Sequence, residues 1–303
     1  MPTRFPAQSP TQLPPLIRRQ ASKPMIDFEA EFTRHLDRFL TGTPANLRAS
    51  IEYSALAPGK RIRPRLLMAV GHLLGAPAEP CRTAGIALEL IHCFTLIHDD
   101  LPCMDDDDFR RGRPSNHKIH GEGLALLAGD AIIPLAIEMI LDTGIPATAK
   151  LEVLRAFVRN MGAAGVIGGQ AKEMLLTAKS SLEDLRAMHA AKTGALFVAA
   201  FEIGRIIGGV DETATGAKAL KDLATALGHA FQVSDDVDDS ETDPGPISIL
   251  SHLDRREAIV AALEPLRTSQ KRIQDLWPDT TLHGPLLHIA AGVEQKLESQ
   301  LTP

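Results

Sequence analysis

The sequence feature that most restricts the fold is a dense group of acids at the end of an apolar segment. Six aspartates lie within ten positions of the chain: Asp99, Asp100, Asp105, Asp106, Asp107 and Asp108. The preceding segment, 84–98, is apolar and has no glycine or proline after Gly85, so it predicts a buried helix that ends at the acids. Because the C-terminus of a helix carries partial negative charge, carboxylates gathered there require a cation. Pro102 disfavours helix at the residue before it, so we expect a bend that brings Asp105 back towards Asp99.

The residue types around these acids indicate an all-oxygen cation site, which suits Mg²⁺, Mn²⁺ or Ca²⁺. The three cysteines, Cys81, Cys93 and Cys103, are too loosely spaced for a zinc cluster. An EF-hand is excluded because Arg110 stands where its loop requires glycine. Arg110 and Arg111 instead fit a diphosphate, which arginine can bind through two parallel hydrogen bonds. For one acidic run alone, a solvated loop with local ion pairs is the commoner alternative.

A second acidic group in the sequence favours a cation site over a solvated loop. Residues 231–239 read FQVSDDVDD and follow another apolar helical run. On a helix, Asp235 and Asp239 are one turn apart and share a face. Two acidic clusters facing one cavity would repel each other unless divalent ions and a polyphosphate joined them. The pair of clusters therefore predicts a site for metal ions and a diphosphate.

The composition favours an all-helical, soluble domain, because aromatic residues make up only 4% and no alternating strand pattern recurs. The net charge of −6 argues against a nucleic-acid surface. Three cysteines without pairing spacings suit the reducing cytoplasm. The nearest approach to a membrane span, 195–210, is interrupted by Glu202 and Arg205, so we expect none. Residues 1–24 contain six prolines and no acid, and they predict a flexible tail before a domain of residues 25–303.

Six motifs, in this order, resemble those of the trans-polyprenyl diphosphate synthases, and are most similar to the bacterial farnesyl diphosphate synthases. They extend over about 180 residues and read GKRIRP (59–64), IHCFTLIHDDLPCMDDDDFRRGRPSNHK (91–118), LLAGDAI (126–132), GGQ (168–170), KTGALF (192–197) and FQVSDD (231–236). The resemblance implies one antiparallel all-α bundle around a deep central cavity, with both acidic clusters at its mouth. It also implies a homodimer.

The resemblance assigns the polar residues of these motifs to three groups. Mg²⁺, as three ions per site and replaceable by Mn²⁺, would be held by Asp99, Asp100, Asp105, Asp235, Asp236 and Asp239. The allylic diphosphate would be bound by Arg110, Lys192, Thr193 and Gln232. Isopentenyl diphosphate would be bound by Lys60, Arg63, His92 and Arg111. We expect catalysis to depend most directly on Asp99, Asp100, Asp105, Arg110, Lys192 and Asp235.

The implied reaction is prenyl transfer by ionisation, condensation and elimination. The allylic C–O bond of dimethylallyl or geranyl diphosphate ionises, isopentenyl diphosphate attacks the cation, and a proton is lost. Phe94 and Thr95 precede Asp99 on the same predicted helix, and we expect them to set the floor of the chain-length pocket. An aromatic residue at the position of Phe94 accompanies a C15 product in the bacterial family, which implies farnesyl diphosphate here. The alternative is that Phe94 is ordinary core.

The sequence also departs from the family. The segment 240–254 is shorter than the usual lid loop, and Pro246 stands where a Gly-Lys pair is expected. The C-terminus, EQKLESQLTP, lacks the usual basic ending, and Glu173 replaces the usual aspartate. Three alternatives therefore stay open: a geranylgeranyl or geranyl diphosphate synthase, a weakly active or non-catalytic subunit that binds prenyl diphosphates, and a terpene cyclase. The cyclase motif fits poorly, because it would place Asp239 at a serine position.

Overall fold

Helices make up nearly all of the regular structure in the part of the chain that the computed structural model describes, residues 28–242 and 248–301. The predicted tail and residues 243–247 of the lid loop lie outside these ranges. The only sheet in the described part is a two-residue antiparallel hairpin. In chain order the elements are α1 (Phe28–Phe39), α2 (Ala45–Ala55), α3 (Ile62–Leu73), α4 (Ala78–Asp99), β1 (Phe109–Arg110), β2 (Arg113–Pro114), α5 (Asn116–His120), α6 (Glu122–Asp142), α7 (Ala147–Met161), α8 (Val166–Glu173), α9 (Leu182–His189), the π-helix η2 (Ala190–Gly194), α10 (Ala195–Ile207), α11 (Thr215–Thr242), the 3₁₀-helix η3 (Ile249–Ser251), α12 (Arg255–Leu276) and α13 (Thr280–Ser299). The all-α prediction is confirmed.

The central helix is α4, which is buried over most of its length and packs chiefly against α6 and α3. A helix that is apolar on all sides must be surrounded by other elements. It begins at Ala78, before the predicted segment, because Pro80 is tolerated in a first helical turn. Gly85 allows α3 to approach closely, since a Cβ atom there would lie 3.2 Å from Pro64 Cβ.

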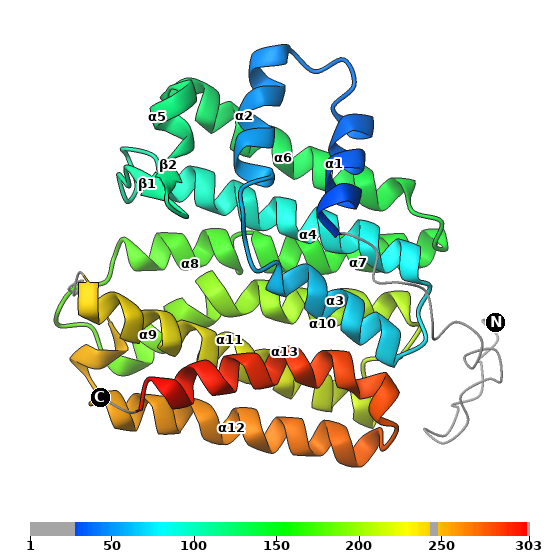
Figure 1. Ribbon diagram of the computed structural model, residues 1–303, viewed down its shortest axis with the longest axis vertical. Helices are drawn as coiled ribbons and strands as arrows, with labels where there is room; N and C mark the ends of the chain where they lie inside the picture. The colour runs from blue at the N-terminus through cyan, green and yellow to red at the C-terminus, as the bar shows by residue number, and fades with distance from the viewer. Residues whose placement is uncertain (1–27, 243–247, 302–303) are drawn as a thin grey trace.

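The arrangement of the helices brings the two acidic clusters to one end of the molecule. Figure 1 shows the helices stacked from α6 and α4 near the top, through α10, to α11, α12 and α13 at the bottom. The C-terminal ends of α4 and α11 both lie at the left of this view, that of α4 beside the hairpin β1–β2 and that of α11 lower down. Since the clusters occupy these two helix ends, residues far apart in sequence converge there.

Two helices, α4 and α6, are long and apolar enough to cross a membrane by length and composition alone. The apolar window of α4 is 83% buried inside the bundle, as expected for the core helix of a globular domain. That of α6 is 44% buried, and its other face leaves Leu126, Leu127 and Leu141 exposed. The expectation that the chain has no membrane span therefore stays a prediction.

Candidate active site

The first acidic cluster folds back on itself at the end of α4. The backbone N–H of Asp105 donates to the carbonyl oxygen of Asp99 at 2.9 Å, and that of Met104 donates to Leu101 at 2.8 Å. This turn places Asp105 beside Asp99, so the bend predicted from Pro102 is confirmed.

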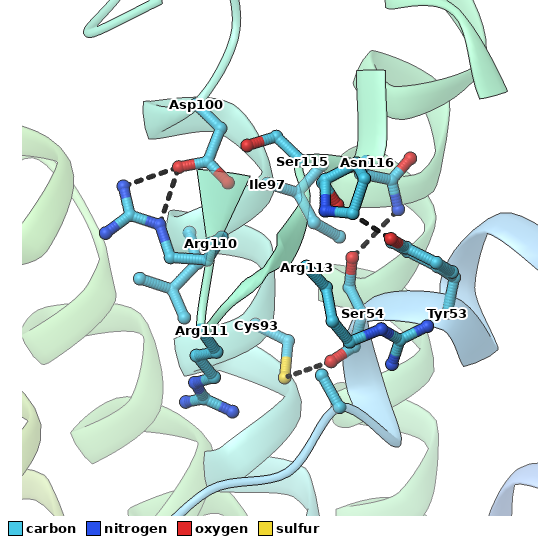
Figure 2. Close-up of a pocket in the computed structure, with 13 residues that line it drawn as sticks. Tyr53, Ser54, Cys93, Ile97, Asp100, Arg110, Arg111, Arg113, Ser115 and Asn116 are labelled. Atoms are coloured by element: carbon cyan, nitrogen blue, oxygen red, sulfur yellow. Dashed lines mark hydrogen bonds and ion pairs between the residues drawn. The ribbon is translucent and has the colours of Figure 1, made fainter. Parts of the chain in front are cut away.

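Arg110 is held by two acids of this cluster. Its Nε donates to Asp100 Oδ1 at 2.7 Å, as Figure 2 shows, and its Nη2 donates to Asp107 Oδ2 at 2.6 Å. Asp100 is buried, and Arg110 is its charged partner. Asp100 therefore orients a guanidinium here, and its role as a metal ligand stays a prediction.

Asp99 is a buried carboxylate whose negative charge is poorly compensated. The residue is only 7% exposed. Burial raises the pKa of Asp99 to about 7; the charge of Lys192 opposes this shift, and the carboxylates of Asp105 and Glu173 add to it. A carboxylate in such surroundings is stabilised by any cation that enters the site.

Lys192 and Thr193 reach the site from the π-helix η2. Helix α8 packs directly on this segment: a Cβ atom on Gly169 would lie 2.4 Å from the backbone nitrogen of Lys192. Lys192 Nζ is paired with Glu173, one of the departures from the family pattern. Thr193 Oγ1 donates to Gln232 Oε1 at 2.6 Å, so two predicted ligands of the allylic diphosphate lie side by side. Single-turn π-helices often mark functional sites.

A lysine side chain from another helix lies beside the second acidic cluster, and the sequence did not predict this contact. Lys296 Nζ, on α13, lies 2.7 Å from Asp238 Oδ2 and 3.5 Å from Asp235 Oδ1. Burial nevertheless raises the pKa of Asp235 to about 6, with Asp239 and Asp238 adding to the shift and Lys296 opposing it. Lys296 supplies part of the positive charge that the C-terminus was expected to lack.

Asp236, whose role as a metal ligand stays a prediction, has two hydrogen-bond partners from other residues. Its Oδ1 accepts a hydrogen bond from Gln232 Nε2 at 2.8 Å, and its Oδ2 accepts one from the backbone N–H of Ile249 at 2.8 Å. Consecutive residues of a helix point about 100° apart, so Asp235 and Asp236 cannot face the same partner. Asp236 instead fastens η3 to α11.

Three of the predicted isopentenyl diphosphate ligands, Arg63 of α3, His92 of α4 and Arg111 of the hairpin, lie close enough to interact electrostatically. Burial lowers the pKa of His92, and the charges of Arg63 and Arg111 lower it further, so the imidazole is neutral at physiological pH. Arg63 lies over the Phe197 ring, with its Cζ atom 5.1 Å from the ring centre. Burial opposes a lower pKa for Asp238, but the pKa is lowered overall, chiefly by Lys296. The charge of Lys60 is also near enough to contribute to this shift.

A small cavity of about 30 Å³, lined in part by Arg110 and Arg111, lies between α2, α4 and the hairpin (Figure 2). The hairpin is fastened to α2 beside it. Tyr53 donates its hydroxyl hydrogen to Pro114 O at 2.7 Å, and Arg113 stacks on the Tyr53 ring at 4.2 Å. Asn116 Nδ2 donates to Ser50 O and to Ser54 Oγ, both at 2.8 Å. These contacts position the strand that carries Arg110.

The two residues expected to limit chain length are buried on α4. The Phe94 ring meets the His98 ring edge-on, at 5.7 Å between centres and 81° between planes. The His98 ring in turn packs on α6, where a Cβ atom on Gly129 would lie 2.1 Å from His98 Nε2. Phe94 therefore packs against a residue, His98, that lies in the contact between α4 and α6. The deep central cavity and the roles of Phe94 and Thr95 stay predictions.

The acidic side chains are of the type that binds divalent metal ions, but among the described residues they are not gathered into a metal site. Within residues 28–242 and 248–301, no three His, Cys, Asp or Glu side chains converge on one point. Three cations of the chain, Arg110, Lys192 and Lys296, lie among the acids instead. The raised pKa values of Asp99 and Asp235 show that these carboxylates are still under-compensated, as expected for ligands of a hard cation.

Comparison with known proteins places the chain among prenyl-transferring enzymes. Residues 44–248 match the profile of the polyprenyl synthetase family. The chain is 40% identical over 217 residues to the farnesyl diphosphate synthase of Geobacillus stearothermophilus, which covers 70% of this chain and 72% of that protein. It is also 40% identical over 198 residues to a chloroplastic geranylgeranyl pyrophosphate synthase of Capsicum annuum, covering 64% of this chain and 53% of that protein.

A solved structure shows the same architecture. A geranyltransferase from Legionella pneumophila superposes with a TM-score of 0.77 at 28% identity, covering 89% of this chain and 95% of that one. The two sequence relatives are named for products of different length, so similarity alone leaves the product open.

Proposed function

The chain belongs to the polyprenyl synthetase family and is a short-chain prenyltransferase, and from this premise we propose that its main product is farnesyl diphosphate. Isopentenyl diphosphate would be condensed with dimethylallyl diphosphate and then with geranyl diphosphate. The observation that supports prenyl transfer is the pair of acidic clusters at the ends of α4 and α11, in which the buried Asp99 and the partly exposed Asp235 both have raised pKa values. Such carboxylates suit a site that receives cations together with a polyanion.

The family generally depends on divalent metal ions, and the acids with the best chemistry for them are Asp99, Asp105 and Asp235, supported by Asp239. Mg²⁺ or Mn²⁺ at these residues would neutralise the diphosphate as the allylic C–O bond breaks.

The residues of the chain itself bind and orient the allylic diphosphate. Arg110, fixed by Asp100 and Asp107, presents its guanidinium to a diphosphate oxygen. Lys192 adds a positive charge, and Thr193 with Gln232 adds polar contacts. Because these groups are held in place before the substrate arrives, little reorganisation is needed as charge develops.

Isopentenyl diphosphate binds in the adjoining basic pocket through Lys60, Arg63, His92 and Arg111. His92 is neutral there, so it contributes a hydrogen bond and no charge. The buried apolar surface around Phe197 excludes water from the carbocation, which water would otherwise capture.

The C15 product length rests on Phe94. Its buried aromatic ring, packed edge-on against His98, would be a steric obstacle to a chain growing down from the diphosphates. A geranylgeranyl diphosphate synthase is the second candidate, since the Capsicum annuum protein is as similar as the Geobacillus stearothermophilus protein.

We also propose a cytoplasmic homodimer. Exposed leucines and a valine lie on the outer faces of α6 and α7, and a second copy would cover them: Leu126, Leu127, Leu141, Leu151 and Val158. Exposed apolar surface of this kind commonly marks an interface.

The test is incubation of the protein with isopentenyl diphosphate, Mg²⁺ and each allylic starter in turn, with product sizing after dephosphorylation. We expect farnesol from both dimethylallyl and geranyl diphosphates. A main product of C20 would support the second candidate. No condensation from any starter, under conditions where a known synthase is active, would support a non-catalytic binding subunit.

A further inference from the structure

Glu89 is a buried acid in the middle of α4 that the mechanism above does not use. The residue is 2% exposed and lies one turn before Cys93 and His92. Its Oε1 accepts a hydrogen bond from Arg61 Nη1 at 2.8 Å and lies 4.0 Å from Arg111 Nη2. A buried carboxylate is tolerated only when it is paired and hydrogen-bonded, so its position is fixed by these two arginines and theirs by it.

Arg61 connects Glu89 to the loop that carries the basic residues of α3. Its backbone is in the left-handed region, with φ of 47°, a conformation that L-residues adopt at an energetic cost. The side chain points inward and donates to Glu29, to Ala55 O at 3.0 Å and to Ala57 O at 2.9 Å. These bonds fix the loop between α2 and α3, and with it the backbone from which Lys60 and Arg63 extend on either side of Arg61.

Arg111 connects Glu89 to the hairpin. Arg111 and Gly112 both have positive φ, of 54° and 72°, as the favoured two-residue hairpin turns require. The Arg111 guanidinium lies against the α2–α3 loop, because a Cβ atom on Gly59 would be 2.7 Å from its Nη1. Glu89 thus lies beneath the point where the hairpin tip and the loop meet.

We propose that Glu89 is a positioning residue for isopentenyl diphosphate: one buried carboxylate that fixes the Lys60–Arg63 segment through its hydrogen bond with Arg61 and attracts the Arg111 guanidinium at 4.0 Å. The negative charge of Glu89 also reduces the repulsion among Arg61, Arg63 and Arg111, so that these arginines can lie close together before a diphosphate binds. The inference rests on the proposed function, since it takes these residues as the isopentenyl diphosphate pocket. It concerns one substrate only, because the hydrogen bond and ion pair that Glu89 makes among the described residues are with Arg61 and Arg111, not with Arg110 or Lys192.

The deciding variant is Glu89→Gln, which keeps the shape of the side chain and removes its charge. We expect KM for isopentenyl diphosphate to rise by about 10- to 100-fold, the usual loss when a charged hydrogen-bond partner is removed, while KM for geranyl diphosphate changes by less than about twofold. Glu29→Gln is the matched control. Glu29 is the other acid on Arg61, but its side chain is 52% exposed, whereas Glu89 is buried.

Calorimetric binding of isopentenyl diphosphate alone gives a second readout that needs no turnover. If wild type neither binds nor condenses isopentenyl diphosphate, the proposed function fails. If wild type binds it and a folded Glu89→Gln binds equally well, only this inference fails. Equal rises in KM for both substrates would also overturn it. Glu89→Asp, which keeps the charge but shortens the reach, should bind with intermediate affinity. Loss of folding in both variants would show a purely structural role and overturn the proposal.

Discussion

Replacing Asp99 by asparagine should stabilise the metal-free protein while it removes transferase activity. Asp99 is buried, and its pKa is raised from 3.8 to about 7. At pH 8 the Asp99 carboxylate is ionised in the folded protein, and because its pKa is raised there, this ionisation lowers the free energy of unfolding. Asparagine has nearly the same size and carries no charge, so the variant avoids this cost.

The magnitude follows from the shift in pKa. A shift of about three units corresponds to roughly 4 kcal/mol at 1.4 kcal/mol per unit, and this is an upper figure because the site can relax. We expect about 2 kcal/mol, or roughly 4 °C in Tm for a chain of this size. The sign is set by the raised folded pKa: the protonated group favours folding below pH 4, and this contribution is lost as pH rises through about 7. The Tm difference between variant and wild type should therefore grow from pH 5 to pH 8.

Thermal melts followed by circular dichroism in excess chelator provide the assay. Asp106→Asn is the control, because Asp106 belongs to the same loop and its side chain is exposed. Mg²⁺ added with inorganic diphosphate should then raise the Tm of wild type and leave the Tm of Asp99→Asn nearly unchanged. An Asp99→Asn variant that melts at or below the wild-type temperature at pH 8 would refute the reasoning, because it would mean that other groups already compensate the carboxylate.

Three further predictions concern turnover and product. Asp235→Ala should lower kcat by about 10²- to 10³-fold with a native circular dichroism spectrum, and full activity of wild type in excess chelator would contradict the metal-dependent mechanism. Phe94→Ala should extend the product to C20 or beyond because it removes a steric obstacle; gas chromatography of the dephosphorylated products that still shows C15 at normal activity would argue against this floor. Lys296→Met should raise KM for the allylic substrate by about tenfold, because it removes the cation beside Asp235 and Asp238, and an unchanged KM would mean that Lys296 only pairs these acids.

Local chemistry made much of the fold and of the acidic site predictable. The apolar run before Asp99 can only be a buried helix, and Pro102 requires a bend after it. Both features are present in α4 and in the turn that returns Asp105 to Asp99. The DDVDD sequence likewise continues a helix, α11, so its acids were correctly placed on one element.

The direction of individual side chains and the contacts between distant elements were not predictable. Asp235 and Asp236 are neighbours in sequence, yet only the packing of η3 against α11 decides that Asp236 is already bonded. Lys296 lies in an ordinary amphipathic helix, and nothing in EQKLESQ indicates that α13 delivers it to the second cluster. Glu89 is a single acid in an apolar segment, and its importance depends on Arg61, whose inward direction follows from tertiary contacts.

The charges around the two acidic clusters explain why the pKa values of Asp99 and Asp235 are raised furthest. Arg110 pairs with Asp100 and Asp107 and opposes the rise that burial causes in the pKa of Asp100, and Lys296 lies closest to Asp238. The acids that pair best with the chain's own cations therefore gain least from an added ion. Asp99 and Asp235 keep pKa values of about 7 and about 6 although Lys192 and Lys296 lie nearby. A bound cation is stabilised most where the negative charge of the carboxylates is least compensated. We therefore expect Asp99 and Asp235 to contribute most to metal affinity. The same excess of negative charge destabilises the free protein, so metal binding and folding stability are linked through the same two carboxylates.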